Sequence, residues 1–273
     1  MTFKPPAGGR MFCTEPGNRA GEASGNPMKN FILSLAALGM LLTAPAYAAV
    51  KSVVLVHGAF VDGSGWKPVA DILERDGYTV SVVQEPLTSF DADVAATRLV
   101  LDRAGPSVLV GHSWGGMIIT AAGDHPAVKS LVYVAAFEPG VGESAGALQT
   151  RTPPAAAQSV VPVGGGFVQV KPELFHQDVA ADLPAEAVRF AAISQVPIAA
   201  ESFSATAKAA AWSTKPSYAV VATQDRMISP DLERFMSRRA KSQTIELAGS
   251  HAIFLSHPRE VAALIEKAAK AAE

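Results

Sequence analysis

A serine, an aspartate and a histidine occur in this chain order, each directly after a stretch that is typical of a buried strand. Ser113 lies in the motif GHSWGG, Asp225 in TQDRMISP and His251 in AGSHAIFLSHP. A serine hydroxyl is a poor nucleophile until a base removes its proton, and an imidazole base needs a carboxylate to orient it. We therefore predict that Ser113 is the nucleophile, His251 the general base and then acid, and Asp225 the orienting carboxylate.

The surroundings of Ser113 make this prediction specific. The motif G-x-S-x-G lies between an apolar strand and a helix, which is the context of a nucleophile elbow. In such an elbow the serine occupies a strained turn that lifts its hydroxyl above the sheet. The flanking glycines let neighbouring backbones pass without a Cβ clash.

Acyl transfer also requires hydrogen-bond donors for a developing oxyanion. The backbone amide of Trp114, directly after the nucleophile, is one predicted donor. The loop after the first strand, His57-Gly58-Ala59-Phe60, is predicted to supply the second, from Ala59 or, as the next choice, Phe60.

Another carboxylate could take the place of Asp225. Glu138 follows the strand predicted at 128–135, and a loop one strand earlier could also reach the histidine. Among the other histidines, His257 precedes Pro258 at the entry to the last helix and is expected to be a surface or capping residue. His125 is expected in a turn beside Pro126, and His176 lies in an insertion described below. We keep Glu138 as an alternative for the acid.

Short apolar runs rich in β-branched residues alternate with helical patterns along residues 50–273. Because parallel strands need crossovers, and the crossovers here are helical, the pattern predicts an α/β fold: a mostly parallel central sheet with helices on both faces. Strands are predicted at 52–56, 78–83, 107–110, 128–135, 218–223 and 243–247, and helices at 66–75, 91–104 (with Asp91 as N-cap), 114–122, 230–239 and 259–272.

The alternation breaks at about residues 138–212. This segment contains Gly164-Gly165-Gly166 and several prolines, with helical patches after Pro172 and Pro184. We interpret it as a small helical cap insertion that covers the sheet edge. The residues predicted to contact substrate are Phe60, Trp114, Phe175, His176 and Trp212, with Phe167 and Phe203 as further aromatic residues of the cap.

Four segments, HGAFVDGSGW, GHSWGGM, ATQDRMISP and AGSHAIFLSHP, resemble the α/β-hydrolase superfamily, and the likeness covers essentially all of 50–273. Within it they are similar to the branch of small-ester carboxylesterases, methylesterases and hydroxynitrile lyases. The resemblance implies a serine hydrolase without metal or organic cofactor, a helical cap and a buried apolar pocket. Lyases of this branch carry threonine and lysine where this chain has Gly58 and Ala252, which favours ester hydrolysis.

Composition limits the partners that we expect. The 273 residues are 49% hydrophobic and 18% charged, with 23 Lys and Arg against 25 Asp and Glu. This balance gives no electrostatic reason to expect nucleic-acid binding. The single cysteine, Cys13, precedes the predicted mature chain, so no disulfide or cysteine-based metal site is expected there.

The N-terminal residues are predicted to contain a targeting segment. Lys29, an apolar run from Phe31 to Leu42, Pro45 and the small-x-small sequence Ala46-Tyr47-Ala48 are together typical of a secretory signal peptide. A membrane-spanning helix is less favoured, because about 20 apolar residues are needed to cross a bilayer and Pro45 interrupts this run.

The predicted organisation follows from this signal. Residues 28–48 are the signal peptide with cleavage after Ala48, residues 1–27 are an over-extended or disordered start ahead of Met28, and 49–273 form the hydrolase domain. The protein is thus expected to be secreted or periplasmic, without a stable membrane anchor.

The expected function is that of an exported serine esterase acting on small carboxylic esters through an acyl-enzyme. One alternative uses the same three residues for lactone hydrolysis, acyl transfer or perhydrolysis. Another is a ligand-binding homologue without catalysis. The sequence indicates a small-molecule ester partner and gives no indication of the oligomeric state.

Overall fold

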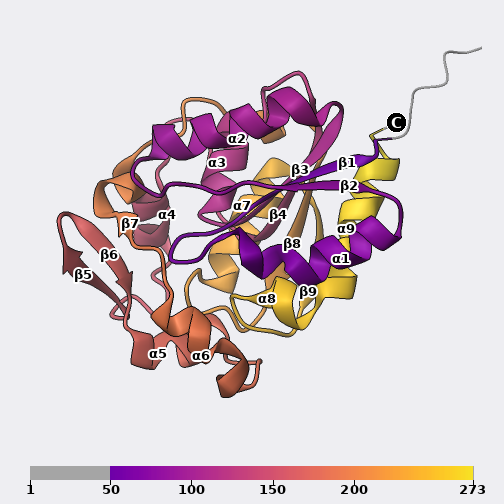
Figure 1. The fold of residues 1–273 in the computed structure, drawn as a ribbon. Helices are drawn as coiled ribbons and strands as arrows, with labels where there is room; N and C mark the ends of the chain where they lie inside the picture. Colours follow the sequence, from indigo (N-terminus) through magenta and orange to yellow (C-terminus); the bar gives the residue numbers. More distant parts are fainter. Residues whose placement is uncertain (1–49, 273) are drawn as a thin grey trace, which may run out of the picture. The chain divides into compact units, whose positions relative to one another are not determined.

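The computed structural model describes residues 50–272, and its centre is a six-stranded parallel sheet in the order β2-β1-β3-β4-β8-β9 (Figure 1). The strands are β1 (Ser52–Val56), β2 (Thr79–Val82), β3 (Ser107–Ser113), β4 (Val128–Ala136), β8 (Ser217–Ala222) and β9 (Gln243–Leu247). All six predicted strands are confirmed, with small differences at their ends. The predictions for residues 1–27 and 28–48 lie outside the described residues.

Alternate side chains of the central strands enter two separate apolar clusters. Val54 of β1 and Leu109 of β3 belong to one cluster, whereas Val53 and Val108 belong to the other. Successive side chains of a strand point to opposite faces of the sheet, so the two clusters lie on its two faces. Burial on both faces explains why these strands are continuous apolar runs in the sequence.

One face is covered by α2 (Phe90–Ala104), α3 (Gly115–Ala122) and α7 (Pro230–Ala240). The other is covered by α1 (Lys67–Arg75), α8 (Ile253–Ser256) and α9 (Pro258–Lys270), with the 3-10 helix η1 (Gly63–Trp66) ahead of α1. Figure 1 shows α2 and α1 on opposite sides of the sheet. The predicted arrangement of helices on both faces is confirmed.

The start of α2 differs from the prediction. The N-cap is Ser89, whose Oγ accepts a hydrogen bond from the backbone N–H of Ala92 at 3.2 Å. Asp91 lies in the first turn instead, where its negative charge favours the helix N-terminus. The N-cap prediction of Asp91 was therefore wrong by two residues, because both side chains suit a helix start.

The cap contains more than the predicted helices and loops. It includes α4 (Ala145–Arg151), α5 (Pro172–Val179), α6 (Ala185–Ile193) and the 3-10 helices η2 (Ala200–Ser204) and η3 (Ala211–Ser213). It also includes an antiparallel three-stranded sheet of β5 (Val160–Gly164), β6 (Phe167–Val170) and β7 (Ile198–Ala199). Positive φ angles of 96°, 59° and 81° at Gly164, Gly165 and Gly166 close the turn between β5 and β6. The glycine run is thus a hairpin turn.

No helix among residues 50–272 combines the length and apolar character needed to cross a membrane.

Candidate active site

Ser113 ends β3 in a left-handed backbone conformation, with φ of 52°. This conformation is strained for a residue with a side chain and is found where the surrounding structure enforces it. The glycines around it are needed for close packing: a Cβ on Gly116 would lie 2.0 Å from the carbonyl oxygen of Phe137, and one on Gly115 would lie 2.7 Å from that of His57. The turn has the geometry of a nucleophile elbow.

The structure brings the three predicted catalytic side chains together. Nε2 of His251 lies 2.8 Å from Oγ of Ser113, and Nδ1 of His251 lies 2.6 Å from Oδ2 of Asp225. Asp225 follows β8 and His251 follows β9, as predicted. An ionised carboxylate only accepts hydrogen bonds, so Nδ1 carries the proton and Nε2 is free to accept one from the serine hydroxyl.

The loop of Asp225 is built to hold a carboxylate. Its Oδ1 accepts hydrogen bonds from the backbone N–H groups of Met227 at 2.7 Å and Ile228 at 2.9 Å. Behind it lies the buried Glu233, whose Oε2 accepts from the N–H of Ala222 at 3.2 Å. Burial, together with the charge of Asp225, raises the pKa of Glu233 well above its ordinary value. This direction favours the uncharged form of Glu233, which reduces its repulsion of Asp225.

The alternative acid, Glu138, lies elsewhere. Its Oε1 accepts a hydrogen bond from Oγ of Ser242 at 2.6 Å, and burial raises its pKa to about 8. The imidazole of His251 contacts Asp225, so the geometry favours Asp225 over Glu138 as the orienting carboxylate.

His112 supports the loop of His251, a role that we did not predict from the sequence. Its Nε2 donates to the carbonyl oxygen of His251 at 3.0 Å, and the centres of the two rings lie 4.6 Å apart. Burial lowers the pKa of His112 well below its ordinary value, so the ring is neutral. In the sequence, only the position of His112 inside the elbow motif could have indicated this role.

The loop after β1 carries the other predicted oxyanion donors, Ala59 and Phe60. His57 fixes this loop, because its Nδ1 donates to the carbonyl oxygen of Gly58 at 2.9 Å and its Nε2 accepts from the N–H of Glu85 at 2.9 Å. A Cβ on Gly58 would lie 2.9 Å from Cβ of Ser113, and Ala59 and Phe60 line the same cavity as Ser113. The loop is thus close enough to the nucleophile for the predicted role.

Trp114 is fully buried beside the nucleophile. Its Nε1 donates to Oδ2 of Asp93 at 2.9 Å, and the centre of its ring lies 5.5 Å from that of Phe203. Asp93 also accepts from the N–H of Leu87 at 2.8 Å. This buried carboxylate fixes the indole, and with it the residue whose backbone N–H is the predicted oxyanion donor.

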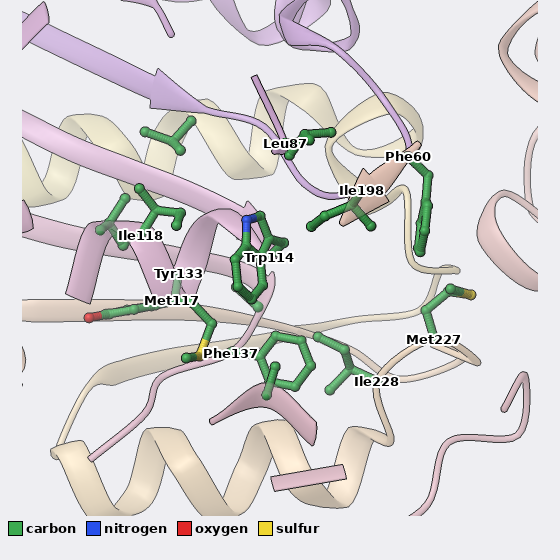
Figure 2. Close-up of a cluster of buried hydrophobic side chains, with 14 of the residues drawn as sticks. Phe60, Leu87, Trp114, Met117, Ile118, Tyr133, Phe137, Ile198, Met227 and Ile228 are labelled. Carbon is green, nitrogen blue, oxygen red and sulfur yellow. The ribbon is translucent and has the colours of Figure 1, made fainter. Parts of the chain in front are cut away.

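A cavity of about 360 Å³ opens at Ser113. Figure 2 shows Phe60, Trp114, Phe137, Met227 and Ile228 arranged around one apolar space. The residues that line the cavity are Ala59, Phe60, Ser113, Trp114, Phe137, Gly146, Gln149, Thr150, Pro153, Pro154, Ala156, Ala157, Val160, Phe203, Met227 and Ile228. Phe60, Trp114 and Phe203 were predicted; Phe137, Met227 and Ile228 were not, although each closely follows a strand or Asp225.

Phe175 and His176, both on α5, do not line this cavity. Phe175 faces a second cavity on the other side of Phe60, so its contact with substrate stays a prediction. Nε2 of His176 donates to the carbonyl oxygen of Leu183 at 2.8 Å and so joins α5 to the following loop. His176 is not among the residues that line the cavity at Ser113, and its contact with substrate stays a prediction. The sequence pattern of a cap helix does not reveal which neighbour each of its side chains contacts.

Trp212 is also placed away from the cavity at Ser113. Its Nε1 donates to the carbonyl oxygen of Pro139 at 2.7 Å, and the guanidinium of Arg239 lies 5.6 Å from the centre of its ring. These contacts hold the end of the cap against α7, and the substrate contact of Trp212 stays a prediction. Phe167 pairs with Ala199 in the cap sheet and does not line the cavity either.

Hydrogen bonds from the cap hold the loops of Asp225 and His251. Nε of Arg226 donates to Oδ1 of Asp178 at 2.7 Å, and Oγ of Ser250 donates to Asp182. The backbone N–H of Ala252 also donates to the carbonyl oxygen of Val179 at 2.8 Å. One short segment, 178–182, therefore contacts residues adjacent to both the predicted acid and the predicted base.

Within residues 50–272, no group of three or more His, Cys, Asp or Glu side chains is arranged to hold a metal ion.

The sheet, the elbow and the order of the site residues define an α/β hydrolase. The chain belongs to the α/β hydrolase family, whose sequence model matches residues 53–264. The resemblance inferred from the motifs is confirmed.

A curated relative is the carbendazim-hydrolyzing esterase of Nocardioides sp. (strain SG-4G), 32% identical over 130 residues. That match covers 42% of this chain and 52% of the relative, so it spans about half of the relative's length.

Similar solved structures share the fold. A pyrethroid hydrolase from Sphingobium faniae JZ-2 has a TM-score of 0.70 at 24% identity, and the match covers 81% of this chain and 98% of the hydrolase. A methylesterase from Arabidopsis has a TM-score of 0.66 at 20% identity, with 80% of this chain and 98% of the methylesterase covered.

Proposed function

We propose that this protein is a serine esterase that hydrolyses small carboxylic esters through an acyl-enzyme. The observation that carries the proposal is the continuous path from Ser113 Oγ to His251 at 2.8 Å and from His251 to Asp225 at 2.6 Å. The named activity of the Nocardioides relative supports an ester substrate.

In the first half-reaction, His251 takes the proton of the Ser113 hydroxyl while the oxygen attacks the ester carbonyl carbon. The carbonyl oxygen becomes an oxyanion, which the N–H groups of Trp114 and of Ala59 or Phe60 stabilise, each by about 3 kcal/mol. His251 then donates its proton to the departing alcohol oxygen. Asp225 keeps the imidazole in the required tautomer and stabilises its positive charge.

In the second half-reaction, water replaces the alcohol. His251 removes a proton from water, which attacks the acyl carbon, and the proton returns to Oγ of Ser113 as the acid leaves. Neither half-reaction requires a metal or an organic cofactor. Gly58 and Ala252 supply no side-chain cation or hydroxyl, which favours hydrolysis over lyase chemistry.

The test is turnover of nitrophenyl acetate together with labelling by an active-site-directed phosphonate. The wild-type protein is expected to show both, and Ser113→Ala neither. Turnover and labelling that persist in Ser113→Ala would contradict the proposal.

We further propose that the protein is exported, on the basis of the signal-peptide pattern at 28–48. N-terminal sequencing of exported material is expected to begin at Ala49. A start upstream of Met28 would contradict this.

A further inference from the structure

The cavity at Ser113 has few polar groups in its wall. Among its lining residues in the described chain, those with a side-chain nitrogen or oxygen are Ser113, Trp114, Gln149 and Thr150. Nε1 of Trp114 donates to Asp93, and the exposed Thr150 hydroxyl donates to backbone carbonyls of its own helix, α4. Apart from the predicted nucleophile, the half-buried Gln149 is therefore the side chain of this wall with an unused polar atom.

The loop of Asp225 holds the amide of Gln149 in one orientation. Nε2 of Gln149 donates to the carbonyl oxygen of Met227 at 3.1 Å, and the N–H of Met227 donates to Oδ1 of Asp225 at 2.7 Å. A carbonyl oxygen can only accept a hydrogen bond, so the NH₂ group of Gln149 must face Met227 and Oε1 must point elsewhere. Within residues 50–272, Oε1 of Gln149 has no hydrogen-bond partner.

A fixed acceptor in a mostly apolar cavity discriminates between ligands. A ligand that donates a hydrogen bond to Oε1 satisfies this atom, whereas an apolar group of the same size removes water from it and leaves it unpaired. A site of this kind disfavours the analogue that lacks the donor. Because the bond to Met227 already fixes the amide, little conformational entropy is lost when the ligand binds.

We propose that Gln149 is a specificity-determining residue whose Oε1 accepts a hydrogen bond from a hydroxyl or N–H group of the substrate. The donor belongs to the part of the ester that occupies the cavity at Ser113. This inference rests on the proposed function and extends it by naming the substrate class: esters that carry a hydrogen-bond donor on an otherwise apolar group.

The first test compares ethyl 3-(4-hydroxyphenyl)propanoate with ethyl 3-(4-methylphenyl)propanoate. The ratio of kcat/KM for the hydroxy ester over the methyl ester is expected to fall by about tenfold in Gln149→Met, which keeps the length of the side chain and removes Oε1. The ratio cancels a general effect on the acid loop from the lost bond to Met227. Gln243→Met, at an exposed residue of β9, is the matched control and should leave the ratio unchanged.

A second pair places the ring on the alcohol side: 2-(4-hydroxyphenyl)ethyl acetate and 2-(4-methylphenyl)ethyl acetate. The pair whose ratio falls in Gln149→Met identifies the half of the ester that reaches Oε1. If neither ratio falls, or if Thr150→Val lowers a ratio that Gln149→Met does not, the proposal is overturned.

A 4-methoxyphenyl ester tests the direction of the hydrogen bond, because its ether oxygen accepts but cannot donate. It should behave like the methyl ester in wild type and in Gln149→Met. A preference for the methoxy ester over the methyl ester that Gln149→Met removes would overturn the assignment of Oε1 as the recognising atom.

Binding to Ser113→Ala provides a readout that does not depend on turnover. For at least one of the two pairs, the ratio of affinities for the hydroxy and methyl esters is expected to fall at least about fivefold once Gln149→Met is added, as measured by calorimetry. Unchanged ratios for both pairs would overturn the inference. If no ester is hydrolysed and no phosphonate labels Ser113, the proposed function itself fails, and the binding result still decides the role of Gln149.

Discussion

The carboxylate of Asp225 is held by three donors: the backbone N–H groups of Met227 and Ile228 on Oδ1 and the imidazole of His251 on Oδ2. These bonds fix the orientation of the carboxylate and satisfy its charge in a buried site. The side chain thus determines which nitrogen of His251 carries the proton.

Asp225→Asn should preserve the fold and remove this control of the tautomer. We expect kcat for nitrophenyl acetate to fall by about three to four orders of magnitude, with an unchanged circular dichroism spectrum. Glu138→Gln is the comparison, since Glu138 contacts Ser242 and not His251. A fall in kcat of less than about tenfold in Asp225→Asn would contradict the assigned role.

Among the secondary-structure elements, the segment 178–182 connects the cap to the two loops that carry the acid and the base. Asp178 binds Arg226, next to Asp225, and Asp182 binds Ser250, next to His251. The cap therefore contributes to the position of the site as well as covering it.

Asp178→Asn removes the charge that Arg226 binds. We expect a loss of about 1.5 to 3 kcal/mol in the free energy of unfolding and a fall in kcat of about tenfold, with a smaller change in KM. Urea denaturation and steady-state kinetics measure these changes. Asp124→Asn, which breaks the exposed ion pair with Arg98, is the matched control, and its cost should stay below about 1 kcal/mol. If both variants behave alike, the segment does not position the site.

The sequence predicted the central elements better than those of the cap. The strands β1, β3, β4 and β8 are buried apolar runs. The order of β3, β8 and β9 in the parallel sheet places Ser113, Asp225 and His251 at the same edge of the sheet. Strand β7 has only 2 residues and β5 is largely exposed, so neither gives a clear apolar pattern. The positions of Phe175, His176 and Trp212 depend on how the cap folds back, which local patterns do not determine.

Across the protein as a whole, several carboxyl groups are buried in the folded state. Burial raises the pKa of Glu85, Asp93, Glu138 and Glu233. A raised folded-state pKa means that the folded protein binds protons more tightly than the unfolded chain. The free energy of unfolding therefore decreases as the pH rises through the interval between the unfolded and folded pKa values.

Glu138 gives this expectation a defined window, because its pKa rises from 4.5 to about 8. In Glu138→Gln the decrease in stability between these pH values should be smaller, by up to about 1.4 kcal/mol for each pH unit. Thermal unfolding at a series of pH values measures it, with Glu74→Gln, an exposed residue of α1, as the control. If the free energy of unfolding of Glu138→Gln depends on pH as strongly as that of the wild-type protein, Glu138 is not buried as an uncharged carboxyl.

The proposed mechanism depends above all on Ser113 carrying the acyl group during turnover. Peptide mass spectrometry of enzyme that is acid-quenched during hydrolysis of nitrophenyl acetate detects this intermediate. We predict one acetyl group on the peptide that contains Ser113, and none on that peptide in Ser113→Ala. Continued turnover with no acetyl group on Ser113, or with the acetyl group on another residue, would contradict the mechanism.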